Sequence, residues 1–169
     1  MLWRMSRIAI IGGGSMGEAL LSGLLRAGRQ VKDLVVAEKH PDRAKYLAEK
    51  YSVLVTSVAD AAENAAYIVV AVKPADVEYV VDEIAGATAH AENEAEQVFV
   101  TIAAGVGTAF YEARLPAGAP VIRVMPNTPA MVGLGTSVLY ATQNATQEDR
   151  ALAQQLTDTA GISLWITDE

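Results

Sequence analysis

The chain has 169 residues, enough for one α/β domain with a sizeable buried core. Its formal net charge of −7 argues against nucleic acid and against an anionic membrane as the main partner. It contains no cysteine, which excludes a disulfide framework, a thiolate metal site and a cysteine nucleophile. The first residues hold no apolar run of signal-peptide length, and no run approaches the roughly 20 residues of a membrane span. We therefore expect a cytoplasmic protein.

Short apolar runs alternate with amphipathic stretches along the whole chain. A continuous apolar run predicts a strand buried on both faces, and apolar residues at helical spacing predict a helix. The expected strands are 8–11, 34–37, 53–55, 67–72, 98–102, 121–125, 137–140 and 162–166, and the expected helices are 16–27, 41–50, 75–85, 108–115 and 147–160. This alternation indicates the α/β class: a Rossmann-type, doubly wound, mostly parallel sheet with helices on both faces. We expect one such domain over residues 1–169.

A glycine-rich turn, Gly12-Gly13-Gly14-Ser15-Met16-Gly17, joins the first expected strand to the first expected helix. In the pattern G-x-G-x-x-G, the first glycine allows the tight turn, the second lets the backbone approach a pyrophosphate, and the third lets the helix pack on the strand. The amino terminus of the helix then offers free N–H groups and the positive end of its dipole. The sequence therefore predicts the pyrophosphate site of a nicotinamide dinucleotide, with a glycine turn that has no ligand as the alternative.

The residues after the second expected strand bear on the choice between NAD and NADP. Glu38 follows the last glycine at the distance of about 20 residues where an acidic residue hydrogen-bonds the ribose 2′-hydroxyl. It favours NADH and repels a 2′-phosphate. Lys39, His40 and Arg43 come directly afterwards and are able to hold that phosphate instead. All four are also compatible with a solvated helix start, so NADH and NADPH both remain open.

Three further polar residues lie at or near strand ends. Lys73 is either a cofactor contact or a side chain that points to solvent. Arg123 interrupts an apolar strand, and we interpret it as a partner in an ion pair rather than a ligand of a substrate carboxylate. Asn127 is either a ligand of the nicotinamide carboxamide or a turn residue between two prolines. No catalytic residue and no metal site is predicted, since the two histidines are far apart in sequence.

Four segments at the expected strand ends, taken together, resemble one enzyme family, the pyrroline-5-carboxylate reductases. They are Ile11 to Gly17, Ala71-Val72-Lys73-Pro74, Thr101-Ile102-Ala103-Ala104-Gly105-Val106 and Arg123-Val124-Met125-Pro126-Asn127-Thr128-Pro129. The resemblance extends from Arg7 to Trp165. It implies reduction of a small cyclic imine, 1-pyrroline-5-carboxylate, to proline, with hydride delivered by NADPH or NADH.

The resemblance also implies a set of cofactor-binding residues. The pyrophosphate would lie on Ile11, Gly12, Gly13, Gly14, Ser15 and Met16, the cleft would be lined by Val72, Lys73 and Pro74, and the nicotinamide would lie beside Ala103, Ala104, Gly105, Pro126 and Asn127. The chain departs from the family at Glu38, Lys39 and His40, where many members have small hydroxyl residues, and at Ala59, where some have asparagine. The family more often uses NADPH, in opposition to Glu38.

In this family an all-helical domain follows the dinucleotide domain, forms the dimer and supplies much of the substrate pocket. The resemblance thus implies that the chain is a truncated, cofactor-binding portion, with a homodimer or higher oligomer expected only when the helical domain is present. The chain alone is expected to have little or no reductase activity. Two other functions remain open: another small NAD(P)-dependent reductase or hydroxyacid dehydrogenase, and a non-catalytic module that binds NAD(P)H.

Overall fold

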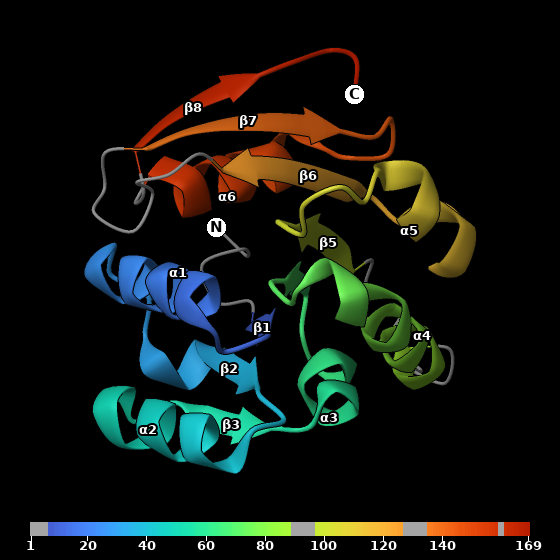
Figure 1. The fold of residues 1–169 in the computed structure, drawn as a ribbon. Coiled ribbons are helices and arrows are strands. Elements are labelled where there is room, and N and C mark those ends of the chain that lie inside the picture. The colour runs from blue at the N-terminus through green and yellow to red at the C-terminus, as the bar shows by residue number, and fades with distance from the viewer. Residues whose placement is uncertain (1–6, 89–96, 127–134, 159–160) are drawn as a thin grey trace.

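The computed structural model describes residues 7–88, 97–126, 135–158 and 161–169. Its strands are β1 (Ile8–Ile11), β2 (Leu34–Ala37), β3 (Leu54–Thr56), β4 (Tyr67–Val70), β5 (Val98–Thr101), β6 (Val121–Pro126), β7 (Gly135–Ala141) and β8 (Gly161–Trp165). Its helices are α1 (Ser15–Arg26), α2 (Pro41–Tyr51), α3 (Val58–Glu63), α4 (Val77–Thr88), α5 (Thr108–Arg114) and α6 (Gln147–Asp158), with 3-10 turns η2 (Val31–Asp33) and η3 (Pro74–Asp76). Strands and helices alternate from β1 to β6, and β7 then follows β6 as the next described element (Figure 1).

The strands form one sheet in the order β3-β2-β1-β4-β5-β6-β7-β8. All neighbouring strands are parallel except β6 and β7. The chain runs outward from β1 through β2 to β3, and then returns to place β4 on the other side of β1. The direction of winding therefore reverses between β1 and β4, and ligands bind at such a switch point in open α/β sheets.

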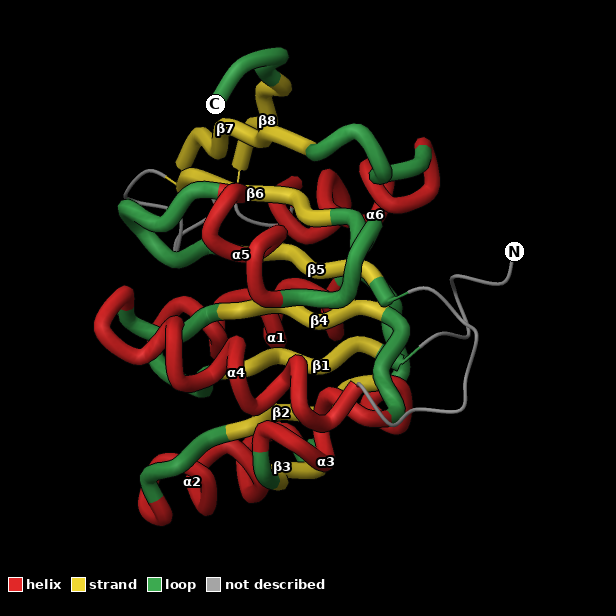
Figure 2. The backbone as a smooth tube through the Cα atoms, turned by 90° about the vertical axis from the view of Figure 1, so that its right-hand side faces the viewer, coloured by secondary structure: helices red, strands yellow, loops and turns green. Residues whose placement is uncertain are grey.

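Alternate residues of each central strand pack on opposite faces of the sheet. Ile8 and Ile10 belong to a core under α1, α2 and α6, whereas Ala9 and Ile11 belong to a core under α3, α4 and α5. Figure 1 shows α1 and α2 to the left of the strands and α3, α4 and α5 to the right. Figure 2 looks onto the face of the sheet covered by α3, α4 and α5, with the strands one above another. Since both faces are covered, the strands read as continuous apolar runs. The predicted fold class is confirmed.

The register brings the carboxyl ends of the central strands to one level. Ile11 at the end of β1 pairs with Ala37 of β2 and with Val70 of β4. Ala37 pairs in turn with Thr56 of β3, and Val70 with Thr101 of β5. Residues that follow these strands therefore emerge along the same edge of the sheet.

The predicted boundaries differ from the structure at several elements. The run 67–72 ends as a strand at Val70, because the partner strand β1 ends at Ile11 and the chain turns at Gly12. The Ala71 N–H still donates to Ile11 O at 2.7 Å. The expected helix 75–85 begins as the turn η3 and becomes α4 only at Val77. Neither α3 nor η2 was predicted, since each is short. Within the described residues, no helix is long and apolar enough to cross a membrane.

Candidate functional site

The turn between β1 and α1 packs so closely that two of its glycines cannot be replaced. Gly12 has a φ of +108°, and a Cβ there would lie 2.7 Å from Ala71 O. At Gly17 a Cβ would lie only 1.9 Å from Gly12 O. The Gly12 N–H donates to Ala37 O at 2.9 Å, which ties the turn to β2. The first and third glycines therefore do what the sequence pattern predicted: one makes the turn, and the other seats α1 on it.

The middle glycine, Gly14, faces open space. It is the N-cap residue of α1, no side chain caps the helix there, and no atom lies within 4 Å of a Cβ built on it. Its carbonyl accepts the first helical hydrogen bond from the Glu18 N–H at 2.9 Å. The first N–H groups of a helix need a partner from outside it, and a phosphate is well suited to them. This cradle fits the pyrophosphate of a dinucleotide.

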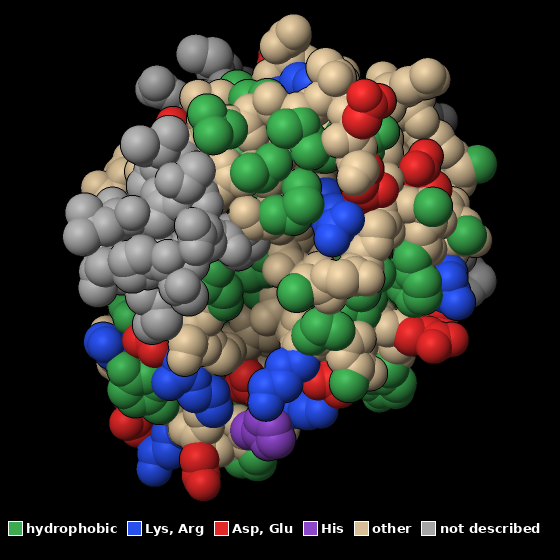
Figure 3. Space-filling view, turned by 45° about the horizontal axis from the view of Figure 1, so that its top comes forward, with side chains coloured by type: hydrophobic (Ala, Val, Ile, Leu, Met, Phe, Trp, Pro, Cys, Tyr) green, Lys and Arg blue, Asp and Glu red, His purple; other side chains and the backbone are tan. Residues whose placement is uncertain are grey.

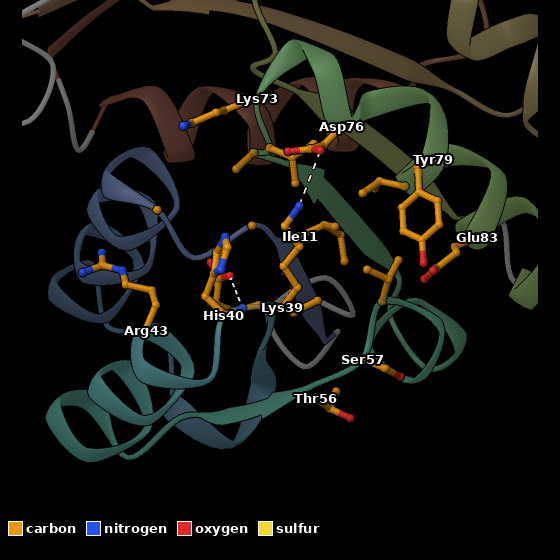
Figure 4. Close-up of a pocket in the computed structure, with 18 of the residues that line it drawn as sticks. Ile11, Lys39, His40, Arg43, Thr56, Ser57, Lys73, Asp76, Tyr79 and Glu83 are labelled. Carbon is orange, nitrogen blue, oxygen red and sulfur yellow. Dashed lines mark hydrogen bonds and ion pairs between the residues drawn. The ribbon is translucent and has the colours of Figure 1, made fainter.

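A cleft of about 820 Å³ opens beside the turn, at the switch point between β1 and β4. Figure 3 shows a hollowed face with basic side chains and a histidine along one side, and Figure 4 shows the lining residues. The lining comes from the ends of four strands and from α2, α3, η3 and α4: Ile11, Gly12, Gly14, Ala37, Glu38, Lys39, His40, Asp42, Arg43, Thr56, Ser57, Val58, Ala71, Val72, Lys73, Asp76, Tyr79, Val80 and Glu83.

Glu38 is fixed at the end of β2 by the backbone. One carboxylate oxygen accepts the Gly13 N–H at 3.0 Å, and the other accepts the His40 N–H at 2.9 Å. A Cβ on Gly13 would lie 3.3 Å from the Glu38 side chain and 2.5 Å from Leu47 Cδ1, so this glycine lets the carboxylate approach the turn. The Glu38 carboxylate is therefore a rigid part of the cleft wall.

The two basic side chains nearest to Glu38 each have an acidic partner. Lys39 Nζ lies 3.5 Å from the Asp76 carboxylate, which comes from η3 on the other side of the cleft (Figure 4). Arg43 donates to Gly13 O at 2.6 Å and to the Glu18 carboxylate at 2.6 Å. Arg43 therefore holds the glycine turn against α2.

Glu18, in the first turn of α1, lies at the centre of a polar cluster. Four side chains of α2, here called the α2 donors, bond its carboxylate: Arg43 at 2.6 Å, Tyr51 at 2.7 Å, Tyr46 at 3.1 Å and Lys50 at 3.3 Å. Partial burial opposes the ionisation of Glu18, but the hydrogen bonds from the α2 donors outweigh it and lower the pKa of this carboxyl to about 2. The cluster clamps α2 to α1 just behind the glycine turn.

The structure brings half of the predicted cofactor-binding residues together in the cleft. They are Ile11, Gly12, Gly14, Glu38, Lys39, His40, Arg43, Val72 and Lys73. Gly13 and Gly17 are buried within the turn, and Ser15 and Met16 form the first turn of α1. Lys73 is exposed at the rim. The assignment of all these residues to a cofactor stays a prediction.

The remaining predicted residues are not in the cleft lining. Pro74 begins η3 and is exposed. Ala103 is 4% exposed and packs in the core beneath α4 and α5. Ala104 and Gly105 are exposed after β5. Asn127 lies outside the described residues.

Arg123 is a partner in an ion pair, as predicted. Its Nη1 lies 3.3 Å from the Glu169 carboxylate. The same carboxylate accepts the Thr108 N–H at 2.8 Å and the Thr108 hydroxyl at 2.9 Å. The Glu169 carboxylate thus joins Arg123 of β6 to the start of α5.

The sequence interpretation missed one wall of the cleft. Asp76, Tyr79, Val80 and Glu83 line it from η3 and α4, and their spacing of three, four and seven residues places them on one helical face. That spacing was the available signal. Interaction with the Glu83 carboxylate, first through hydrogen bonding and then through its charge, raises the pKa of the Tyr79 hydroxyl.

A second missed group follows β3. Thr56, Ser57 and Val58 line the cleft, because the strand ends at Thr56 and not at Val55. Ser57 accepts the Asp60 N–H at 3.2 Å and thereby begins α3. Ala59, at which the expected asparagine of the family was sought, is an exposed residue of α3.

The sheet order, the glycine turn and the cleft define a Rossmann-type NAD(P)-binding domain. Residues 7–105 match a family model described as "NADP oxidoreductase coenzyme F420-dependent", and the chain belongs to that family. Over 169 residues it is 63% identical to a pyrroline-5-carboxylate reductase from Mycobacterium tuberculosis, a match that covers 99% of this chain and 57% of the relative. The chain thus spans just over half the length of this relative.

Solved structures agree with this placement. A pyrroline-5-carboxylate reductase from Coxiella burnetii has a TM-score of 0.89 and 29% identity, over 98% of this chain and 60% of that one. The fold is also that of Plasmodium falciparum pyrroline carboxylate reductase with NADP bound, which has a TM-score of 0.78 and 22% identity over 96% of this chain and 58% of that one. The resemblance predicted from the strand-end segments is confirmed.

Proposed function

We propose that this chain is the cofactor-binding portion of a cytoplasmic pyrroline-5-carboxylate reductase, which reduces 1-pyrroline-5-carboxylate to proline in the last step of proline biosynthesis. The observation that carries the proposal is the 63% identity to the M. tuberculosis reductase over 169 residues. The cradle at Gly14 and the adjoining cleft support it independently, because they have the shape and the free N–H groups that a dinucleotide requires.

In this proposal the first turn of α1 holds the pyrophosphate and Glu38 meets the adenosine ribose. Val72 and Lys73 line the part of the cleft between the adenosine and the nicotinamide of the bound dinucleotide. Ala103, Ala104, Gly105 and Asn127 belong to the nicotinamide end, as in the family that the chain resembles. When bound, NADPH or NADH supplies the hydride for the C=N carbon of the imine. The NADP named for the family and for the P. falciparum protein supports a nicotinamide dinucleotide in the cleft.

The chain's own contribution is to orient the dinucleotide. A protonated imine is already a good hydride acceptor, so no strong acid of this domain is required. The two reacting rings must be held face to face, which converts an encounter into a positioned reaction. We assign the other wall of the substrate pocket, and the dimer contact, to a helical domain that corresponds to the rest of the relatives' length.

The test is a chimaera that supplies the missing wall. This chain replaces the matching part of the M. tuberculosis reductase, whose remaining part is left unchanged. We expect the chimaera to oxidise NADPH or NADH when 1-pyrroline-5-carboxylate is added, and the 169-residue chain alone to stay far below the roughly 1 s⁻¹ of an ordinary enzyme. A chimaera that binds dinucleotide but reduces no imine would overturn the proposed reaction. If the chimaera instead oxidised a hydroxyacid, the chain would belong to a dehydrogenase. If it turned over neither substrate, the chain would be a module that only binds the dinucleotide.

The cofactor site has its own test at Gly14. The substitution Gly14→Glu adds a negative side chain in open space, so it blocks the pyrophosphate without disturbing the packing. We expect the Kd of dinucleotide to rise at least about 100-fold, which is roughly 2.7 kcal/mol. The matched control is Gly86→Glu, an exposed position of α4 that also has no atom within 4 Å of its Cβ. Wild-type affinity in Gly14→Glu would remove the pyrophosphate from this turn.

A further inference from the structure

The choice between NADH and NADPH is made where the adenosine ribose meets the protein. The two cofactors differ by one phosphate on the 2′-oxygen, which adds a charge of about −1.5 to −2 at neutral pH. In Rossmann domains this oxygen lies at the end of the second strand, so the charges there decide which cofactor is bound more tightly. In this chain the end of β2 is followed by Glu38, Lys39, His40, Asp42 and Arg43, all of which line the cleft.

Glu38 cannot turn away from the ribose position without losing both of its bonds to the backbone. Its two oxygens accept the N–H groups of Gly13 and His40, at 3.0 and 2.9 Å. An ionised carboxylate has about four acceptor positions, so about two are still free. These free positions suit the 2′- and 3′-hydroxyls of the NADH ribose. A 2′-phosphate at the same place would face a fixed negative charge.

The neighbouring cations are already neutralised. Lys39 reaches across the cleft to Asp76 at 3.5 Å (Figure 4). Arg43 is bonded to the Glu18 carboxylate and to Gly13 O, both at 2.6 Å. Asp42 adds a further carboxylate to the lining. A phosphate at the end of β2 would therefore compete with an existing carboxylate partner for Lys39 or for Arg43.

We propose that Glu38 makes this cleft select NADH over NADPH, and that the Lys39–Asp76 ion pair strengthens the selection by withholding Lys39 from a 2′-phosphate. The inference rests on the proposed function only in that the cleft binds a dinucleotide. The proposed preference for NADH differs from the cofactor named for the family and for the P. falciparum protein, which is NADP. The departure originates in this chain's own residues at the end of β2.

The test is a titration of the chain with NADH and with NADPH, followed by nicotinamide fluorescence at one fixed salt concentration. We expect NADH to bind at least about 10-fold more tightly, a difference of roughly 1.4 kcal/mol. Glu38→Gln removes the charge and keeps the size of the side chain. This substitution should lower the Kd of NADPH at least about 10-fold relative to the Kd of NADH. Asp76→Asn releases Lys39 and should tighten NADPH relative to NADH about 3-fold.

The control variant is Glu49→Gln, which removes the same charge from α2 outside the cleft lining. Its ratio of the two Kd values should equal that of the wild type within a factor of two. Asp76→Asn keeps the proposal testable if Glu38→Gln does not fold, because Asp76 makes an ion pair between exposed side chains.

Each outcome of the titration separates the two proposals. Tighter binding of NADPH by the wild-type chain overturns the selection by Glu38 and leaves the dinucleotide site in place. A ratio that Glu38→Gln leaves unchanged, or that Glu49→Gln shifts equally, also overturns it. Binding of neither cofactor overturns the dinucleotide site itself.

Discussion

Two glutamates lie close to the glycine turn, Glu18 where α1 packs on α2 and Glu38 at the cleft end of β2. They differ in whether the protein supplies cations to their carboxylates. Glu18 is 17% exposed and receives the side chains of the α2 donors, two of which are cationic. Within the part of the chain that the structure describes, Glu38 accepts hydrogen bonds from backbone N–H groups and lines the cleft. Its charge is oriented by hydrogen bonds without being neutralised.

The difference separates a structural carboxylate from one that can act on a ligand. The charge of Glu18 is matched within the protein, so it contributes to stability and has little effect beyond the cluster. The charge of Glu38 remains to be matched by whatever enters the cleft. Because two backbone N–H groups hold the Glu38 carboxylate in place, it cannot move aside for a 2′-phosphate, and it therefore discriminates between NADH and NADPH.

The largest effect on both glutamates is expected when the glycine turn that they contact is displaced. Gly17→Ala places a Cβ 1.9 Å from Gly12 O, a backbone atom that cannot swing aside. We expect a loss of about 3 kcal/mol or more in the free energy of unfolding. Gly14→Ala, with open space around its Cβ, should cost less than about 1 kcal/mol as a poorer N-cap. Urea unfolding of both variants measures this, and equal stabilities would contradict the described packing of α1 on the turn.

Removing only the charge of each glutamate compares directly how much each carboxylate contributes to the free energy of unfolding. Glu18→Gln weakens four charge-assisted contacts to a carboxylate that is itself 17% exposed, and should cost about 2 kcal/mol. Glu38→Gln should cost about 1 kcal/mol or less, since one backbone N–H keeps an oxygen acceptor. The control is Glu49→Gln: Glu49 is 69% exposed and 4.0 Å from Lys45, so the change should cost under about 0.5 kcal/mol. A Glu38→Gln variant less stable than Glu18→Gln would reverse the roles that we give to the two carboxylates.

Much of the fold could be predicted because its signal is local. The central strands are buried on both faces, so each appears as an apolar run, and the glycine turn is contiguous in sequence. Where the structure differs, a distant partner decides: β4 ends at Val70 because its partner strand β1 ends at Ile11. The helix α3 has only six residues after its N-cap Ser57, and half of them are alanines, so it is too short to show a helical period of apolar side chains.

The candidate site also has a part that could be predicted from the sequence and a part that could not. Glu38 could be placed at the cleft from its distance to the glycine turn. What could not be predicted is which cations are engaged, because Lys39 meets Asp76 and Arg43 meets Glu18 only after β1, β2 and β4 have aligned. No local pattern encodes those pairs. The sequence alone left the cofactor open for this reason.

The last expected effect is a dependence of the Glu18→Gln stability difference on pH, which reports Glu18 alone. Burial opposes its ionisation, but the α2 donors lower the pKa of its carboxyl from 4.5 to about 2. A carboxyl with a lowered pKa stabilises the fold fully above its unfolded pKa and loses that contribution as the pH falls toward the folded one. The difference in stability between the wild type and Glu18→Gln should thus stay constant from pH 7 to about 5, and shrink between about 4.5 and 2.

The α2 donors do not disturb this window. Bonds to Tyr46 and to Glu18 raise the pKa of Lys50, while burial and the bond to Glu18 raise the pKa of Tyr51. Both groups therefore stay protonated while Glu18 titrates, and the pH dependence reports the carboxyl. Urea unfolding of the two proteins at pH 7, 5, 4 and 3 measures it. A stability difference that stayed constant down to pH 3 would show that the α2 donors do not stabilise the ionised form of Glu18, and the contrast with Glu38 would then lose its electrostatic basis.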